Sequence, residues 1–235
     1  MSSSYFISFL QVFNTITAVI LILSPAVAFI PIIKGKEKYT NIPVLMLIFN
    51  LLTNLCWGCY WCRVTRYSPM ICSIICSIIA TVFFFIYLYF FSNKNIKKYM
   101  IYSIALIFIE VLIVYISYYV VKSLKYFGIF LIVINIFMFI APAQNILRVI
   151  KEKNYKLIPI ASTIVGTLCS GGWFIFGKLV NDINCIIPNG LGLISSIITT
   201  IIWSYYYIRA KLNQRKMKFY PEQNNISNAG NVEIK

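Results

Sequence analysis

The sequence predicts an all-α integral membrane protein with seven transmembrane helices, arranged as two parallel three-helix repeats joined by an inverting linker helix. The first observation behind this class is composition. Of the 235 residues, 60% are apolar and 11% are charged, which leaves too little polar surface for a water-soluble domain. The second is that seven apolar segments reach the roughly 20 residues that a helix needs to cross hydrocarbon. The third is a repeat of proline and tryptophan spacings.

Hydropathy sets the bounds of the seven predicted helices. The first segment is too long for a removable signal peptide and lacks a basic leader. The connections are short and leave no room for a soluble catalytic domain, so we expect no enzyme and no catalytic residues. The predicted helices span 6–33, 42–62, 69–91, 99–121, 126–150, 157–180 and 185–208.

Basic residues gather in the connections on one side of the predicted membrane. The chain has 21 Lys and Arg against 6 Asp and Glu, a formal net charge of +15. In a soluble protein this charge would suggest nucleic acid, but here the positions matter more. With the N-terminus outside, sixteen of the 21 basic residues lie in cytoplasmic connections and in the tail 209–235. Because Lys and Arg are retained in the cytoplasm, we predict an outer N-terminus, a cytoplasmic C-terminus and no nucleic-acid partner.

The prolines repeat at matched spacings in the two ends of the chain. Pro25 is followed eight and nine residues later by Ile-Lys, and Pro142 is followed by Ile-Lys at the same spacing. An Ile-Pro pair then follows in each half. Pro43 lies 18 residues after Pro25, and Pro159 lies 17 residues after Pro142. The two halves differ by only one insertion or deletion over this stretch, which indicates a true internal repeat.

The tryptophans continue the same register. Trp57 lies 14 residues after Pro43 and Trp173 lies 14 residues after Pro159, with an aromatic residue three positions later in both halves. Three helices invert the chain direction, so the halves are parallel only if one extra helix lies between them. We therefore predict a first repeat over 1–91, a linker helix over 92–125 and a second repeat over 126–208, followed by a basic tail. Such repeats enclose a path with the substrate near the membrane midplane.

From about Phe6 to Ile208 the chain resembles the SWEET (MtN3/saliva) family of sugar facilitators. The resemblance is carried by SPAVAFIPIIKGKEKYTNIP, NLLTNLCWGCYW, APAQNILRVIKEKNYKLIPI and, most specifically, GGWFIFGKLVNDINCIIPNGLG. The last resembles the W-x2-YG…D…PNG signature of the second repeat, with Phe176 where Tyr is usual. In the first repeat, Gly58-Cys59-Tyr60-Trp61 departs from W-x2-YG. The resemblance implies bidirectional facilitated diffusion of mono- or disaccharides.

Prolines 25, 43, 142 and 159 are candidate hinges. Each removes a backbone donor and clashes with the preceding turn, which kinks a helix. In SWEETs the corresponding tetrad supports rocking between outward-open and inward-open states. The alternative is that these prolines are simply tolerated in transmembrane helices, as prolines often are.

Four residues are candidates for sugar binding by the resemblance and the repeat. Facing indoles can stack on the apolar face of a sugar while short polar side chains bind its hydroxyls. Trp173 and Asn189 match the family's binding positions, and Trp57 and Ser73 occupy the equivalent positions of the first half. Ser73 stands where an Asn is common. We interpret the remaining Trp61 and Trp203 as residues of the interfacial aromatic belt.

Two further pairs are candidate cavity residues. Thr53 and Cys169 lie four residues before the two tryptophans, and Leu21 and Met138 lie four residues before the first proline of each half. If they line the cavity, their bulk favours a monosaccharide such as glucose. Helix packing is an equally good interpretation of both pairs.

The outer end of the path has a candidate gate. Asp182 matches the family's extracellular gate acid, and Tyr60 is its expected partner, with Arg63 or Arg66 nearby. A gate needs weak contacts that form and break readily. A loop acid without any such role is the alternative.

The ionisable residues bear on energy coupling. The chain has no histidine, and the predicted spans contain one acid, Glu110, in the linker helix. Ion-driven carriers place ionisable groups in the path, so we predict a uniporter. Three interpretations of Glu110 remain: its side chain is shielded from lipid, it pairs with a neighbouring helix, or it is protonated.

The seven cysteines lie mostly in apolar runs, where a thiol behaves as a small hydrophobic group. Cys56, Cys59 and Cys62 have a C-x2-C-x2-C spacing that suggests a metal out of context. A thiolate site needs a loop that wraps the ion, whereas this run lies in a predicted helix. We therefore expect structural cysteines, no metal and no cofactor.

Two other classes of membrane protein fit the sequence less well than a sugar carrier. A PQ-loop exporter of lysosomal or vacuolar amino acids is the main alternative, but Pro25 and Pro142 are each followed by Ala instead of Gln. A seven-helix receptor or retinal protein lacks the 3+1+3 repeat. We expect a plasma-membrane location, the lipid bilayer as surroundings and, by the resemblance, a possible homo-oligomer.

Overall fold

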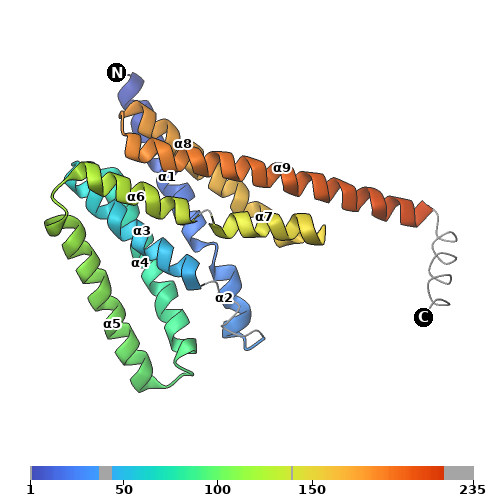
Figure 1. Cartoon of the computed structure of the whole chain (residues 1–235), viewed down its shortest axis with the longest axis horizontal. Coiled ribbons are helices and arrows are strands. Elements are labelled where there is room, and N and C mark those ends of the chain that lie inside the picture. The colour runs from blue at the N-terminus through green and yellow to red at the C-terminus, as the bar shows by residue number, and fades with distance from the viewer. Residues whose placement is uncertain (1, 37–43, 139, 220–235) are drawn as a thin grey trace.

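A computed structural model describes residues 2–36, 44–138 and 140–219, and every element in this part is helical (Figure 1). The elements in order are α1 (Ser2–Leu23), α2 (Ala26–Ile33), α3 (Val44–Arg63), α4 (Tyr67–Phe91), α5 (Ile96–Tyr115), a π-helical turn η2 (Ile116–Val120), α6 (Leu124–Met138), α7 (Ile140–Glu152), a 3-10 turn η3 (Tyr155–Leu157), α8 (Ile160–Leu179) and α9 (Ile183–Phe219).

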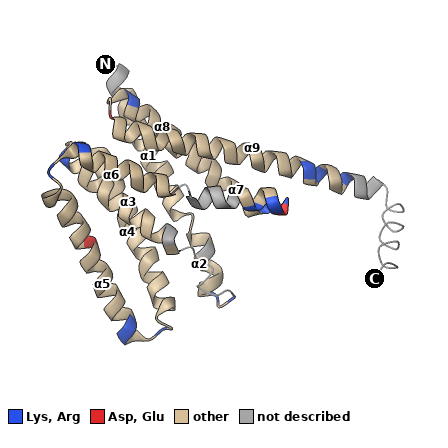
Figure 2. Ribbon diagram, in the orientation of Figure 1, with Lys and Arg blue, Asp and Glu red and all other residues tan. Residues whose placement is uncertain are grey.

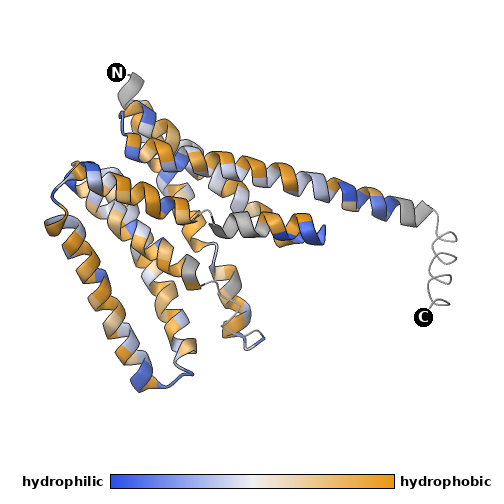
Figure 3. Ribbon diagram, viewed as in Figure 1, coloured by the Kyte–Doolittle hydropathy of each residue, from blue (hydrophilic) through white to orange (hydrophobic). Residues whose placement is uncertain are grey.

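These elements account for the seven predicted crossings. The first crossing is α1 with α2, and the fifth is α6 with α7. Within the described residues, α1, α4, α5 with η2, α8 and α9 are each long and apolar enough to cross a membrane unaided. Large side chains such as Ile104, Phe108 and Val111 of α5 are more than 60% exposed, and Figure 3 shows that the helices consist largely of hydrophobic residues. The chain is a multi-pass membrane protein.

Prolines mark two of the helix breaks. The first crossing breaks after Leu23, and Pro25 directly precedes α2. Pro142 lies in the first turn of α7, where its missing N–H has no intrahelical partner to lose. Pro159 was predicted to kink a helix. In the structure it follows the separate turn η3 and directly precedes α8. Pro43 lies outside the described residues.

The two halves have the same helix order. In the first half α4 contacts both α1 and α3, and in the second half α9 contacts α8, α6 and α7. Across the halves, α1 packs on α8 and α3 packs on α6. The first helix of each half therefore lies against the second helix of the other half, as expected for two copies of one unit facing each other.

Helix α9 is longer than the hydropathy indicated. The sequence predicted a crossing that ends at Ile208, but the helix continues to Phe219 and extends beyond the other helices (Figure 1). Lys, Arg, Gln and Met in this extension favour helix, and cations near a helix C-terminus are stabilised by the helix dipole. Figure 2 shows basic residues along this end of α9. Part of the predicted basic tail is therefore helical.

Asn14 of α1 is fully buried against α8, and neither amide atom has a hydrogen-bond partner. It lies against Gly172, where a Cβ would overlap its Oδ1. The second half has Leu131 at the matching position, 11 residues before the first proline, and it is also fully buried. Asn14 is therefore an unsatisfied polar group at a position that the repeat fills with leucine.

We expect Asn14→Leu to raise thermal stability. A buried polar group without a partner costs about 1–3 kcal/mol, and leucine removes this cost at similar volume. The melting temperature of the protein purified in detergent is therefore expected to rise by a few degrees. Asn135→Leu is the matched control, because the Asn135 amide donates to the Leu131 carbonyl at 2.7 Å and its loss gives no such gain. A lower melting temperature for Asn14→Leu would contradict this account.

Candidate functional site

Three stacked indoles lie where α3 of the first half meets α8 of the second. The ring centroids of Trp57 and Trp61 are 5.3 Å apart, and those of Trp61 and Trp173 are 6.3 Å apart, each pair within 21° of parallel. Trp57 and Trp173 are half-buried. The structure therefore brings the two predicted binding tryptophans into one cluster, with Trp61 between them.

The prediction that Trp61 belongs to an interfacial belt is wrong. Its side chain is 3% exposed and lies inside the aromatic cluster. Hydropathy cannot separate the two places, since a tryptophan near a helix end suits either a membrane interface or a contact between helices.

One aromatic ring from each half packs edge-to-face against the indole of the same half, with matching geometry. Tyr60 meets Trp57 at 5.4 Å and 88°, and Phe176 meets Trp173 at 5.5 Å and 89°. Both also meet Trp61 edge-on, at 5.3 and 6.1 Å. Edge-to-face pairs of this kind contribute about 0.5–1.5 kcal/mol each beyond burial. The cluster is therefore well packed across the boundary between the halves.

The two predicted polar residues each bond one turn back along their own helix. The hydroxyl of Ser73, which is buried, donates to the Pro69 carbonyl at 3.0 Å. The amide Nδ2 of Asn189, which is half-buried, donates to the Cys185 carbonyl at 2.8 Å. The Cys185 thiol in turn donates to the Trp173 carbonyl at 3.4 Å, which links Asn189 to the aromatic cluster.

The two further candidate pairs are Thr53 with Cys169 and Leu21 with Met138. Thr53 and Cys169 are both buried. Cys169 lies beside the Thr17 hydroxyl of α1, and Leu21 of α1 lies against Gly166 of α8. These are helix-packing contacts of α1 with α8, so a cavity role for these residues stays a prediction. The side chain of Met138 is outside the described part.

Tyr60 and Asp182 join the two halves at one end of the cluster. The Tyr60 hydroxyl donates to the Asp182 carboxylate, at 3.1 Å to Oδ1 and 2.9 Å to Oδ2. Nδ2 of Asn184 donates to the Tyr60 oxygen at 3.0 Å. This bonded group connects the end of α3 to the start of α9 and so joins the two halves.

Asp182 also begins α9. Its Oδ1 accepts a hydrogen bond from the backbone N–H of Asn184 at 3.0 Å, as expected for an N-cap residue. Asn181 before it has φ +53°, the left-handed conformation that commonly ends a helix. The sharp α8–α9 connection therefore fixes the carboxylate opposite Tyr60.

Arg63 points elsewhere than predicted. Its guanidinium donates to the carbonyls of Ser117, Val121 and Lys122 at 2.6–3.1 Å, which ties α3 to the end of η2. In the described part of the chain Asp182 has no ion-pair partner. The Asp182 carboxylate is therefore held by neutral donors, and Arg63 holds the end of the linker helix instead.

Comparison with known proteins agrees with this arrangement. A sequence model of the family described as "Sugar efflux transporter for intercellular exchange" (MtN3_slv) matches residues 125–211. The bidirectional sugar transporter SWEET1 of Arabidopsis thaliana is 29% identical over 83% of this chain and 81% of its own length. SWEET7 of the same plant is 26% identical over 90% and 85%. SWEET10 of the same plant is 27% identical over 78% of this chain and 65% of its own length.

A solved structure, that of a eukaryotic SWEET transporter at 3.7 Å resolution, has the same fold. It superposes with a TM-score of 0.76 over 88% of this chain and 99% of that chain, at 21% identity. The chain is therefore similar to the SWEET sugar transporters over most of its length and has the fold of a SWEET transporter. The family model and these relatives are described as transporters.

Two residues near the Tyr60–Asp182 group were missed by sequence reasoning. Asn184 completes the Tyr60–Asp182 group, and its position two residues after Asp182 in a first helical turn was an available signal. Gly128 of α6 lies against Asn184, where a Cβ would overlap the amide. The glycine thus permits the close approach of α6 that the group requires.

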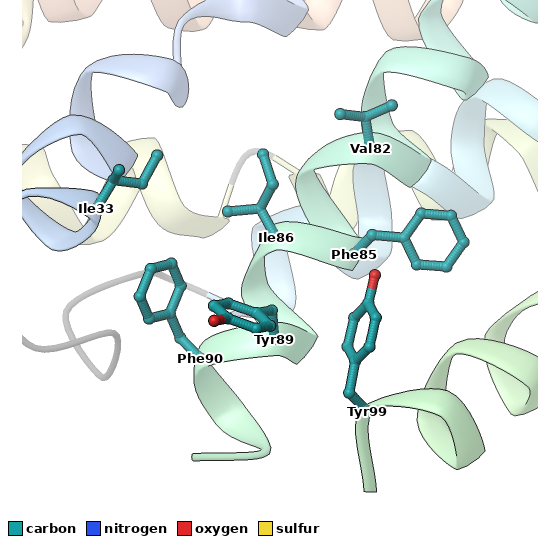
Figure 4. A pocket seen from close by; sticks show the side chains of 7 residues that line it. All are labelled: Ile33, Val82, Phe85, Ile86, Tyr89, Phe90 and Tyr99. Carbon is teal, nitrogen blue, oxygen red and sulfur yellow. The ribbon is translucent and has the colours of Figure 1, made fainter. Parts of the chain in front are cut away.

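Two cavities lie along the first half of the chain and the linker helix. One, of about 400 Å³, has an aliphatic and aromatic lining at the Phe91 end of α4. Figure 4 shows its lining residues, which are Ile33, Val82, Phe85, Ile86, Tyr89, Phe90 and Tyr99. Because sugar hydroxyls need polar partners, this groove suits acyl chains better than a sugar.

The second cavity, of about 580 Å³, lies between α3, α4 and α5. Glu110 borders it and accepts a hydrogen bond from the Thr81 hydroxyl at 2.8 Å. Cys59 and Cys62 border it as well, while the Cys56 sulfur lies 3.7 Å from the Ser117 hydroxyl. The structure therefore gives Glu110 a partner on a neighbouring helix.

Proposed function

We propose that this chain carries sugars, with monosaccharides such as glucose as the expected substrates, in both directions across a membrane by alternating access. The observation that carries the proposal is the aromatic cluster between the halves. Trp57 and Trp173 come from equivalent positions of the two repeats and lie next to a polar group that joins the halves at one end. A site shared by two units is the arrangement that alternating access requires.

The chemistry of the four binding residues suits a sugar. Indole faces stack on the C–H face of a pyranose ring, and the amide of Asn189 and the hydroxyl of Ser73 offer donors and acceptors to its hydroxyls. Both polar side chains now bond their own helices through flexible side-chain rotors. They can exchange these bonds for bonds to a substrate.

We propose that residues 1–91 and 126–208 move as the two units, with 92–125 as the linker. The break between α1 and α2 before Pro25 and the break between α6 and α7 before Pro142 fall at equivalent points of the two halves. Together with Pro43 and Pro159 they are the proposed hinges. Tyr60 and Asp182 are the proposed gate at the outer end, closed in this state.

For its membrane placement we propose an outer N-terminus, a cytoplasmic C-terminus and a plasma-membrane location. This orientation puts the basic ends of α7 and α9 in the cytoplasm (Figure 2), in line with the retention of Lys and Arg on that side. We further propose a homo-oligomer, which cross-linking in native membranes tests.

Radiolabelled glucose uptake in cells that lack hexose transporters tests the proposed function. We expect saturable uptake that is unchanged by a proton uncoupler, and efflux from preloaded cells at a similar rate. Labelled amino acids at the same concentration serve as the comparison for the PQ-loop alternative. Failure to transport any hexose or disaccharide, with the protein shown at the cell surface, would overturn the proposal.

We expect Glu110→Gln to leave sugar flux within about twofold of wild type. Glu110 lies on the linker helix, outside both repeats, and glutamine keeps an acceptor for the Thr81 hydroxyl. A coupling acid would instead make uptake sensitive to the uncoupler, and its amide variant would remove that sensitivity. The measurement is initial glucose uptake with and without uncoupler in both proteins. Uncoupler-sensitive wild-type uptake that becomes insensitive in Glu110→Gln would contradict uniport.

A further inference from the structure

The indole of Trp61 fills the space between the two tryptophans that we propose to bind sugar. It stacks on Trp57 at 5.3 Å and on Trp173 at 6.3 Å, nearly parallel to both. A pyranose held between two indoles would occupy this same space. In the state described, Trp61 takes the place of the substrate.

The internal repeat shows that this indole is not required by the fold. Trp61 lies 18 residues after Pro43, and the residue 18 after Pro159 is Gly177. Gly177 is buried where α8 meets α9, and a Cβ there would approach the Ile186 backbone to 3.1 Å. The second half thus uses the position for close helix contact, while the first half uses it for a large side chain. The W-x2-YG pattern of the first repeat also has glycine here.

The Trp61 indole is also linked to the outer closure. Tyr60 precedes it in the chain and meets it edge-on at 5.3 Å, while the Tyr60 hydroxyl holds Asp182 at 2.9 Å. Phe176 meets its other side edge-on at 6.1 Å. The indole is therefore confined while the Tyr60–Asp182 bond is intact, and separation of the halves at this end releases it.

From this placement we propose that Trp61 is a specificity-determining residue that limits the site to single-ring sugars. The proposal rests on the proposed function. To admit a substrate between Trp57 and Trp173, the indole must turn aside, and its bulk then still borders the site. One sugar ring replaces one indole between the stacking partners, whereas a second ring has no comparable space.

Trp61→Gly, which reproduces the Gly177 arrangement, tests this proposal. We expect sucrose uptake to rise at least tenfold above wild type, while glucose uptake persists with a higher KM because one wall of the site is lost. Trp61→Phe is expected to give an intermediate sucrose rate. Trp203→Gly is the matched control, because Trp203 stacks on Tyr207 of α9 at 4.8 Å, away from the cluster, and we expect it to leave the sucrose-to-glucose ratio unchanged.

The outcomes separate this proposal from the proposed function. Wild-type glucose transport with no gain of sucrose transport in either Trp61 variant would overturn the role of Trp61 and leave the sugar carrier standing. Absence of glucose transport in the wild type would overturn the carrier itself. Replacing a buried tryptophan leaves a cavity that can unfold the protein, so surface amount is measured for each variant. If Trp61→Gly does not reach the surface, the sucrose-to-glucose uptake ratio of Trp61→Phe tests the role of Trp61, and a ratio equal to that of the wild type would overturn it.

Discussion

Trp173→Ala is expected to lower saturable glucose uptake at least tenfold. The variant removes one of the two indoles that we propose to stack on the sugar and leaves its side of the site open. Burial of an aromatic face against an apolar surface contributes about 2 kcal/mol, which corresponds to about thirtyfold in affinity. The loss is expected mainly in KM when glucose is varied, because the indole contacts the substrate throughout the cycle. Initial uptake rates at matched surface amounts provide the measurement.

The companion variants distinguish substrate contact from packing. Trp173→Phe keeps an aromatic face and is expected to restore most of the flux. Asn189→Ala removes hydrogen bonds worth about 1 kcal/mol each and is expected to lower uptake several-fold without affecting the aromatic cluster. Trp203→Ala is the matched control, because Trp203 lies 14 residues beyond Asn189 on α9, about 21 Å along the helix. Equal losses for Trp173→Ala and Trp203→Ala would contradict a specific site at Trp173.

The seven crossings and the pairing of the halves were predictable because hydropathy and proline spacing are properties of the linear sequence. The direction in which Trp61 points was not. Helix α3 carries Leu, Phe, Trp, Cys and Tyr around its circumference, and its Asn and Thr residues, Asn50, Thr53 and Asn54, all precede Trp57. Hydropathy alone therefore does not indicate which side of its Trp61 end meets α8. The burial of Trp61 depends on the packing of α3 against the second half, which only the three-dimensional arrangement supplies.

The candidate gate was partly predictable for a related reason. The family motif placed Asp182 and Tyr60 at the same end of the path, and the structure joins them. The motif does not say that the Asn184 side chain reaches Tyr60 or where Arg63 points, since both depend on how closely α6 and η2 approach. That Pro159 directly precedes α8 instead of lying inside a helix could not be predicted, because prolines in these two places look alike in sequence.

Tyr60→Phe is expected to shift the protein strongly toward the state that is open at the outer end. The variant removes the hydroxyl that donates to Asp182 and accepts from Asn184, while the ring keeps its edge contacts with Trp57 and Trp61. A hydrogen bond to a charged group contributes about 1.5–3 kcal/mol. The ratio of open to closed molecules is therefore expected to rise about tenfold or more. Because transport needs both states, glucose flux falls as well.

The distance between spin labels across the outer end measures this shift. Arg66 precedes α4 and Lys178 lies near the end of α8, and both are exposed, so Arg66→Cys with Lys178→Cys spans the closure. We expect a longer-distance population to grow in Tyr60→Phe and not in Tyr67→Phe, whose 68% exposed ring makes it the matched control.

Asp182→Asn extends the test of the closure. Asparagine keeps the N-cap of α9 but removes the charge that strengthens the bond from Tyr60. We therefore expect a smaller opening than in Tyr60→Phe, with melting temperature close to that of the wild type. Asp182→Ala loses the cap as well and is expected to lower stability by about 1 kcal/mol. If the label distances are the same in wild type, Tyr60→Phe and Asp182→Asn, the bond between the halves does not hold the outer end closed. The aromatic cluster would then be the element that does so.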